Sequence, residues 1–196
     1  MTTIGFIRHG ETDWNIEKRA QGCIDIPLND QGKQQAFAVA ERCKNENWDI
    51  IYTSPLSRAF HTANAIAEQT GLSLIIDERL REISFGDTEG TTEAERVEKW
   101  GEEWKTLELG REKNEEADTR WKAALKEIVQ NHPDQKVLIV SHGALLVRIF
   151  KHLLQDQTDK WYGLNNTSFS KFRVQNEDWF CELFNCNKHL NERLTT

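Results

Sequence analysis

Short apolar runs alternate with polar turns along the chain. The runs at 4–7, 50–53 and 137–140 are rich in β-branched residues, a pattern that favours buried β-strands. Each run leads into a turn with a basic side chain or an imidazole. These turns contain Arg8-His9-Gly10, Ser54-Pro55-Leu56-Ser57-Arg58 and Ser141-His142-Gly143. If the three strands lie side by side in a parallel sheet, their turns meet at its carboxyl edge, where open α/β sheets bind ligands.

Segments with helical periodicity separate these strands. Ala36, Val39, Ala40 and Cys43, for example, recur at the spacing of one helix face. We predict helices at about 13–18, 30–46, 55–70, 116–131 and 143–154, and further strands at 72–76, 168–174 and 179–184, the last two forming an edge hairpin. Residues 77–90 and the tail beyond 185 are expected to be irregular. The alternation of strands and helices predicts an α/β sandwich.

The ends of the helix at 55–70 carry recognisable signals. Ser54 is expected to cap it, Pro55 to occupy its first position, and Gly71 to end it. The helix at 30–46 is expected to be capped by Asn29.

The stretch 91–118 differs in composition from the rest of the chain. It contains ten acidic and five basic residues together with Trp100 and Trp104. This composition predicts a mostly helical, solvated insertion, and we expect a lid at about 84–115. Trp14, Phe85, Trp100 and Trp104 either line an aromatic pocket or pack the lid onto the body.

Composition and charge exclude several classes of protein. The net charge of -7 argues against non-specific binding of nucleic acid. No apolar run approaches the roughly 20 residues that span a bilayer, and the N-terminus lacks a secretory signal. The four cysteines have no Cys-x-x-Cys spacing, so we expect buried or idle thiols. We therefore expect a cytoplasmic monomer or homodimer in which any anion site is made by locally clustered cations.

Two arginines stand where a positive charge is costly. Arg58 is expected in the first turn of a helix, where the helix dipole disfavours a cation by roughly 0.3–1 kcal/mol. Either it points to solvent, or it shares an anion with the free N–H groups of that turn. Arg8 directly follows a buried strand, where a charge requires a partner. Because guanidinium groups match phosphate oxygens bidentately, the two arginines together predict a phosphate site.

The six histidines fall into two groups. His9 and His142 each precede a glycine at a strand end, and this matched pair is the candidate for chemistry. Surface positions are expected for His61, His132, His152 and His189. Metal binding is the main alternative use of paired histidines. It requires further anionic ligands, and two adjacent arginines would repel the metal, so we expect no metal.

Five stretches, in order, resemble the histidine phosphatase superfamily, the phosphoglycerate-mutase-like proteins. They are Arg8-His9-Gly10-Glu11-Thr12, Pro27-Leu28-Asn29 through Ala36, Ser54 through Ala59 with Thr62-Ala63, Leu80-Arg81-Glu82 through Gly90, and Ser141-His142-Gly143. Asn166-Thr167-Ser168 resembles the entry to a late strand of that family. The resemblance covers nearly the whole chain. It implies a three-layer α/β/α sandwich with a mostly parallel mixed sheet, in one domain over 1–196.

The resemblance also implies a role for each matched residue. His9 would attack phosphorus and form a phosphohistidine, while Arg8, Arg58 and His142 would hold the phosphoryl oxygens. Glu82 would protonate the leaving alkoxide and then activate the hydrolytic water. The expected substrate-binding residues are Arg8, Asn15, Gln21, Arg58, His142 and Gly143.

The choice of the acid rests on the resemblance alone. The residues themselves do not distinguish Glu82 from Glu78, Asp87 or Glu89. Thr88 stands where many family members have an aromatic side chain, often Trp, so we expect a less apolar or more open wall near Glu82.

Three functions fit this pattern. The first is a phosphomonoesterase that acts on a small-molecule phosphate and needs no cofactor. The second is a cofactor-dependent phosphoglycerate mutase, in which the segment before Ser-His-Gly is longer than here. The third is a non-catalytic phosphate-binding module. We expect the phosphatase, because the acidic insertion is a poor wall for a second phosphate and because both histidines, both arginines and the glutamate are present.

Overall fold

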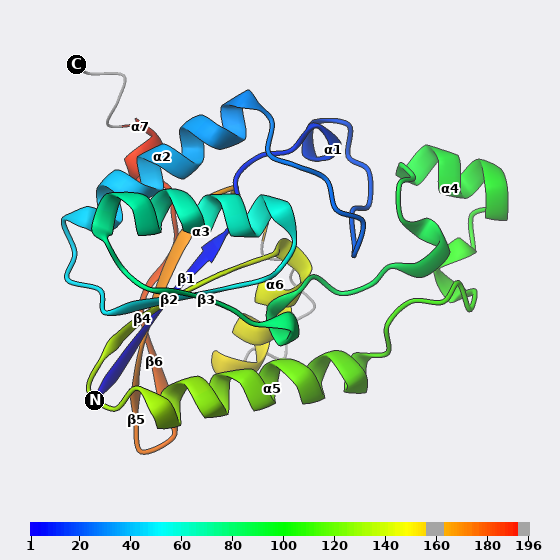
Figure 1. The fold of residues 1–196 in the computed structure, drawn as a ribbon. Coiled ribbons are helices and arrows are strands. Elements are labelled where there is room, and N and C mark those ends of the chain that lie inside the picture. The colour runs from blue at the N-terminus through cyan, green and yellow to red at the C-terminus, as the bar shows by residue number, and fades with distance from the viewer. Residues whose placement is uncertain (156–162, 192–196) are drawn as a thin grey trace.

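The computed structural model describes residues 1–155 and 163–191 of the chain. Its centre is one six-stranded sheet in the order β3-β2-β4-β1-β5-β6 (Figure 1). β1 to β4 run parallel to one another. β5 runs antiparallel to β1 and forms with β6 the antiparallel hairpin predicted at the edge. The strands are β1 (Thr2–Arg8), β2 (Ile50–Thr53), β3 (Leu74–Ile76), β4 (Lys136–Ser141), β5 (Phe169–Gln175) and β6 (Asp178–Cys186).

The register brings the three predicted turns to the same edge. Arg8, the last residue of β1, pairs with Ser141 of β4. Thr53, the last residue of β2, pairs with Val140 of the same strand. The three strands therefore end at nearly the same level, and the residues that follow them emerge together. The parallel arrangement predicted from the apolar runs is confirmed.

Helices cover both faces of the sheet, as the positions of the labelled helices in Figure 1 show. They are α1 (Asp13–Ile16), α2 (Asp30–Lys44), α3 (Ser57–Thr70), α4 (Glu93–Trp100), α5 (Asn114–Asn131), α6 (Gly143–Leu153) and α7 (Lys188–Asn191). Neighbouring residues of β1 serve opposite faces, because side chains alternate along a strand. Ile7 packs with α2 and α3 in one apolar cluster, and Phe6 packs with α5 and α6 in the other. The three-layer α/β/α sandwich is confirmed.

The start of α3 differs from the prediction. The helix begins at Ser57, and its N-cap is Leu56, which makes no side-chain hydrogen bond there. Ser54 does not cap the helix: its hydroxyl pairs with Nε2 of His142 at 2.7 Å and accepts from the backbone N–H of Leu56 at 3.3 Å. Pro55 consequently lies in the connecting turn. The other end agrees with the sequence: Gly71 adopts a left-handed conformation, φ 72°, which favours glycine.

The predictions for the tail and for His189 were wrong. α7 is helical and packs against α2. His189 is buried, and its Nε2 contacts the hydroxyl of Thr167 at 3.3 Å. A single histidine in a polar tail carries no periodic signal, so its burial was invisible in the sequence. Residues 192–196 lie outside the described part of the chain.

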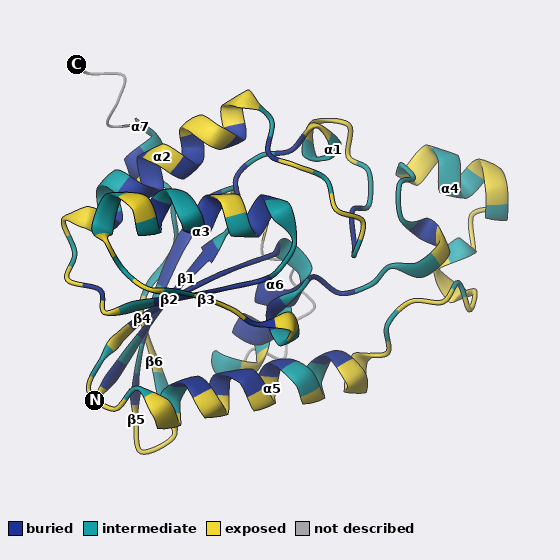
Figure 2. Cartoon of the chain, in the orientation of Figure 1, coloured by how far each residue is buried: buried dark blue, intermediate teal, exposed yellow. Residues whose placement is uncertain are grey.

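Residues 84–115 project from the body as one excursion of the chain (Figure 1). The excursion contains the 3₁₀ turns η2 (Gly86–Thr88) and η3 (Trp104–Thr106) and the helix α4, which has no buried residue. Figure 2 shows exposed and intermediate positions along α4, in contrast to the buried inner faces of α5 and α6. The solvated character predicted from the charges is therefore confirmed, and the role of a lid stays a prediction. No helix of residues 1–155 and 163–191 is long and apolar enough to cross a membrane.

Candidate active site

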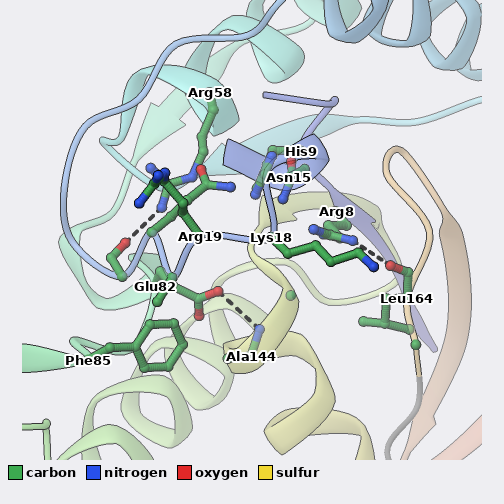
Figure 3. A pocket seen from close by; sticks show the side chains of 15 residues that line it. Arg8, His9, Asn15, Lys18, Arg19, Arg58, Glu82, Phe85, Ala144 and Leu164 are labelled. Atoms are coloured by element: carbon green, nitrogen blue, oxygen red, sulfur yellow. Dashed lines mark hydrogen bonds between the residues drawn. The ribbon is translucent and has the colours of Figure 1, made fainter. Parts of the chain in front are cut away.

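A cavity of about 490 Å³ opens at the carboxyl edge of the sheet (Figure 3). Its lining residues are Arg8, His9, Asn15, Lys18, Arg19, Ala20, Gln21, Gly22, Arg58, Glu82, Phe85, Gly143, Ala144, Gly163 and Leu164. The structure thus brings together every predicted site residue except His142. That residue lies behind the wall, with its ring centroid 5.2 Å from that of His9. Four lining side chains are cationic and one is acidic, so the cavity is locally positive in a chain of net charge -7.

The ring of His9 is held in one tautomer. Its Nδ1–H donates to the carbonyl of Gly10 at 2.6 Å, which leaves Nε2 as the nitrogen with a free lone pair. No described residue forms a hydrogen bond to Nε2. The turn is tight at Gly10, where an added Cβ would lie 2.5 Å from the carbonyl oxygen of Gly32. Burial, and then the charges of Arg8 and Arg58, lower the pKa of His9 well below its usual range, so the imidazole is neutral.

Arg58 is buried and Arg8 is half-buried, and both have donors left over. Arg58 is fully buried, and its Nη1 and Nη2 donate to the carbonyls of Ile24 and Gly22, each at 2.8 Å. Arg8 donates through Nη1 to the carbonyl of Leu164 at 2.5 Å. The Nε atoms of both are buried without a partner in the described part of the chain. Burial lowers the pKa of each, yet a guanidinium remains charged at neutral pH. Cations that are withdrawn from water and have unmet donors favour the binding of an anion.

His142 completes this group from behind. Its Nε2 pairs with the hydroxyl of Ser54 at 2.7 Å, and its Nδ1 is buried without a partner among the described residues. Burial is the main cause that lowers the pKa of His142 well below its usual range, with Arg58 next. We call Arg8, His9, Arg58 and His142 the phosphate cradle. Its unmatched nitrogens on three different turns would suit the oxygens of one phosphoryl group.

Glu82 faces the cradle from the opposite wall of the cavity. Its carboxylate accepts hydrogen bonds from the backbone N–H groups of Ala144 at 3.0 Å and Leu145 at 2.9 Å, at the N-terminus of α6 (Figure 3). A third comes from the N–H of Ile83 at 2.9 Å. The start of α6 and these donors hold the Glu82 carboxyl group in a fixed position.

The family model of the histidine phosphatase superfamily, branch 1, matches residues 4–187. This chain is a histidine phosphatase superfamily member. The resemblance noted from the motifs is thereby confirmed over nearly the whole length.

Individual relatives of this superfamily member include proteins named as phosphatases and proteins named as phosphoglycerate mutases. The uncharacterized phosphatase PhoE of Bacillus subtilis is 35% identical over 97% of this chain and 98% of its own. Phosphoserine phosphatase 1 of Hydrogenobacter thermophilus is 33% identical over 98% and 96%. A mycobacterial glucosyl-3-phosphoglycerate phosphatase structure aligns with a TM-score of 0.84 at 29% identity, covering 94% and 99%. A relative of Yersinia enterocolitica, 34% identical over 91% and 88%, is named a probable phosphoglycerate mutase, GpmB. The prediction of a phosphatase is confirmed.

The structure separates Glu82 from the three competing acids in this superfamily member. Of Glu78, Glu82, Asp87 and Glu89, only Glu82 lines the cavity. Glu89 is committed to structure, because its Oε1 accepts from the N–H groups of Cys23 and Phe85. Glu78 and Asp87 are exposed.

Fewer aromatic side chains line the cavity than the sequence analysis considered. Of the four predicted aromatic residues, only Phe85 is among the described lining residues. Thr88 is buried, and its hydroxyl donates to the carbonyl of Phe85 at 2.8 Å. The small side chain at 88 thus fastens the loop that presents the Phe85 ring, and the wall near Glu82 keeps one apolar surface.

Asn15 and Gln21 present polar atoms to the cavity. The Oδ1 of Asn15 accepts from the Thr12 backbone N–H at 3.1 Å and from Asn166 at 3.2 Å, so its amide N–H group has no described partner. The Oε1 of Gln21 is buried and unpartnered among the described residues. Asn166 also donates to the carbonyl of His9 at 3.1 Å and so holds the turn.

Sequence reasoning missed three cations of this site. Lys18 and Arg19 line the cavity, but they belong to none of the sequence motifs described above. Lys18 has φ 57°, an unusual left-handed conformation for a lysine. Arg120 of α5 lies outside the cavity. It contacts the backbone beside Glu82 over a sequence distance of 38 residues, which no local pattern reveals.

Arg120 fastens the segment that carries Glu82. Its Nη1 donates to the carbonyls of Arg79 at 2.7 Å and Arg81 at 2.8 Å, and its Nη2 donates to that of Glu82 at 3.2 Å. Its Nε pairs with Glu112 at 2.6 Å, and both side chains are nearly buried. One guanidinium therefore holds the acid loop, which we define as residues 79–90, from behind.

Proposed function

We propose that this phosphatase hydrolyses small phosphate monoesters through a phosphohistidine on His9. The observation that carries the proposal is the state of that ring: a neutral imidazole whose Nδ1 is fixed by Gly10, set beside two arginines whose buried Nε atoms lack a partner in the described chain. A nucleophile needs a free lone pair, and a phosphoryl group needs its charge matched. The cradle supplies both.

In the first step, the Nε2 of His9 attacks phosphorus in line with the ester oxygen. The N–P bond forms as the P–O bond breaks, and the charge on the phosphoryl oxygens is met by Arg8, Arg58 and His142. Glu82, in its protonated form, gives its proton to the leaving alkoxide. Asn15 and Gln21 are proposed to orient the phosphoryl group from the side of the cavity mouth, where Gly143 leaves room beside Arg8.

In the second step, water takes the place of the alcohol. Glu82, now a carboxylate fixed at the start of α6, removes a proton from this water as its oxygen attacks phosphorus. The N–P bond breaks, His9 recovers its lone pair and inorganic phosphate leaves. The first half of the cycle uses Glu82 as an acid and the second half uses it as a base, so the protein ends in its starting state.

The substrates we propose are small metabolite phosphates. A cavity of about 490 Å³ suits a compact leaving group. Phe85 offers it an apolar surface, and Lys18 and Arg19 favour an anionic substituent. Phosphoserine and glucosyl-3-phosphoglycerate, for which two relatives are named, are the first compounds to measure.

The test is phosphate release from 4-nitrophenyl phosphate and a metabolite panel, with EDTA present and absent. We expect turnover that survives EDTA and is lost in His9→Ala. Within the described residues no three His, Cys, Asp or Glu side chains gather to hold a metal. Activity that requires a metal, or that persists in His9→Ala, would overturn the mechanism.

A second measurement separates the mutase. The protein is incubated with 3-phosphoglycerate, with and without 2,3-bisphosphoglycerate. We expect phosphate release without isomerisation, because the excursion at 84–115 carries more acids than bases. Fast isomerisation that depends on the bisphosphate, with little phosphate released, would assign the mutase function instead.

A further inference from the structure

A second cavity, of about 310 Å³, lies between the end of α2 and the start of α7. Its lining residues are Arg42, Asn45, Glu46, Cys186, Lys188 and His189, none of which lines the active-site cavity. It combines a thiol, an imidazole and two cations, of which only Arg42 has a carboxylate partner in the described chain, Glu46 at 3.2 Å. Nothing in the proposed phosphatase mechanism uses these groups.

Cys186 is placed as a reactive thiol would be. The Nη1 of Arg42 donates to its Sγ at 3.4 Å. Arg42 is itself held in place, because its guanidinium stacks on the ring of Phe169 at 4.3 Å and pairs with Glu46. Burial alone would raise the pKa of the Cys186 thiol, but the backbone N–H of Lys188 and then Arg42 outweigh it, and the net pKa is lowered.

The other three cysteines provide the contrast. All four are free thiols. Burial raises the pKa of Cys23 and of Cys181, and it raises that of Cys43 to about 12. Cys181 lies on the same strand as Cys186 and is the more exposed of the two. Accessibility alone therefore predicts that Cys181 reacts first, and electrostatics predict the reverse.

His189 gives an independent sign of a ligand. It is 6% exposed and lines the same cavity. The hydroxyl of Thr167 donates to the carbonyl of Asn166, so the contact from His189 to that hydroxyl uses Nε2–H. Nδ1 is then an acceptor, and it is buried without a partner in residues 1–155 and 163–191. Burial lowers the pKa of His189 to about 4, so the ring is neutral. A buried acceptor that lacks a partner fits a ligand with an N–H donor.

We propose that Cys186 is a thiolation site for small peptide disulfides that carry carboxylates. The Sγ thiolate attacks one sulfur of the disulfide, a new S–S bond to Cys186 forms, and the old S–S bond breaks. The second half leaves as a thiolate, so the exchange needs no further oxidant or reductant. Carboxylates of the bound half face Arg42 and Lys188, and an amide N–H is available for Nδ1 of His189.

The test compares two disulfides of opposite charge on the whole protein. Oxidised glutathione carries carboxylates and amides, whereas cystamine carries only ammonium groups. Each is added at pH 7, and the mass of every cysteine-containing peptide is followed over time. The net charge of -7 favours cystamine for the molecule as a whole. We expect oxidised glutathione to modify Cys186 several-fold faster than cystamine does, and several-fold faster than it modifies Cys181.

Four substitutions locate the cause. Cys186→Ser removes the modification and keeps turnover of 4-nitrophenyl phosphate. Arg42→Gln is expected to slow thiolation of Cys186 to about the rate of Cys181, whereas Arg42→Lys keeps most of it. Because Arg42 also packs on Phe169, Lys188→Gln, at an exposed position, is the second arm and is expected to reduce the preference for oxidised glutathione.

Several results would overturn the proposal. One is Cys181 reacting first with both reagents, which would mean that accessibility decides. Another is cystamine modifying Cys186 faster than oxidised glutathione, which would mean that the cavity does not select carboxylates. Retention of the glutathione preference in Arg42→Gln and in Lys188→Gln, each with normal turnover, would remove the two cations from the explanation.

Discussion

The phosphate cradle is fixed mainly by the sheet, whereas the acid loop is fixed by side chains. Arg8 ends β1, and the turn after it is tied to β4, because the N–H of His9 donates to the carbonyl of Ser141 at 2.9 Å. Glu82 belongs to no strand. It is held by the start of α6 and, from behind, by Arg120 and Glu112. The groups that would bind phosphate are thus positioned by the core, whereas the group that would act on the leaving group is positioned by a few polar and charged contacts.

This difference teaches that the two halves of the site can change independently. A substitution in the cradle removes a donor or the nucleophile from a buried position, so it affects every substrate. A substitution around the acid loop displaces Glu82 and Phe85 together, so its effect depends on the leaving group. Specificity within such a fold can then vary through residues 79–115 without loss of the cradle.

Replacing the nucleophile gives the largest effect. We expect His9→Ala to lose at least about 10⁴-fold in kcat with every substrate. His142→Ala, the matched change in the same cradle, is expected to lose only about 10²–10³-fold, because it removes one donor and leaves the attacking atom. Steady-state kinetics with 4-nitrophenyl phosphate measure both, with circular dichroism as the control for folding. Equal losses of kcat in the two variants would contradict the separate roles of His9 as nucleophile and His142 as hydrogen-bond donor.

Removing the acid gives the next effect, and it depends on the leaving group. In single-turnover experiments, Glu82→Gln is expected to slow the cleavage of phosphoserine by roughly 10²–10⁴-fold. Cleavage of 4-nitrophenyl phosphate should be slowed much less, because its phenolate leaves without a proton. Glu78→Gln, an exposed neighbour, is the control and should change neither rate. A uniform loss with both esters would contradict the role of Glu82 as the acid.

Loosening the acid loop should give a smaller loss of the same kind. Arg120→Met removes the bonds to three backbone carbonyls, and we expect a roughly 10- to 100-fold loss with phosphoserine. The loss with 4-nitrophenyl phosphate should be smaller, and inhibition by inorganic phosphate should stay unchanged. Arg148→Met, which breaks the ion pair to Asp118 on the same side of the sheet, is the control. Weaker phosphate inhibition in Arg120→Met would show that the two halves are not separate.

The smallest expected effect is that of pH on kcat/KM of the unmodified protein. Burial and two arginines lower the pKa of His9, and the neutral ring is the nucleophile. Protonation therefore begins only well below the usual histidine value of about 6.5. We expect kcat/KM for the dianionic ester, corrected for substrate ionisation, to stay flat from pH 7.5 to pH 6. A fall centred near pH 6.5 would mean that His9 titrates like an exposed histidine.

The sequence predicted the parts of this molecule that depend on local pattern. β1, the turn at His9 and Gly10, and the helix ends at Asn29 and Gly71 follow from apolar periodicity and backbone preference, and each is found in the structure. The parallel sheet followed from the alternation of elements.

The parts that depend on long-range contacts were not predictable. Arg120 donates to backbone carbonyls. Every residue has a backbone carbonyl, so no sequence pattern identifies these partners. Ser54 was expected as a helix cap. Its hydroxyl instead pairs with His142, and a pairing between residues 88 positions apart leaves no local signal in the sequence. His189 is buried and contacts Thr167, which lies 22 positions earlier in the chain. The choice of Glu82 among four acids needed the family motif, since all four share one charge and one neighbourhood.

The central claim is that phosphate passes through Nε2 of His9, and rapid-quench trapping tests it most directly. Glu82→Gln should form the intermediate from 4-nitrophenyl phosphate but hydrolyse it slowly, because the base for water is gone. After a quench in alkaline denaturant and digestion, the variant should carry one phosphoryl group on the peptide that contains His9. The amount of this phosphopeptide should equal the burst of nitrophenolate. A burst with no phosphoryl group on that peptide, or the group on another residue, would contradict the account.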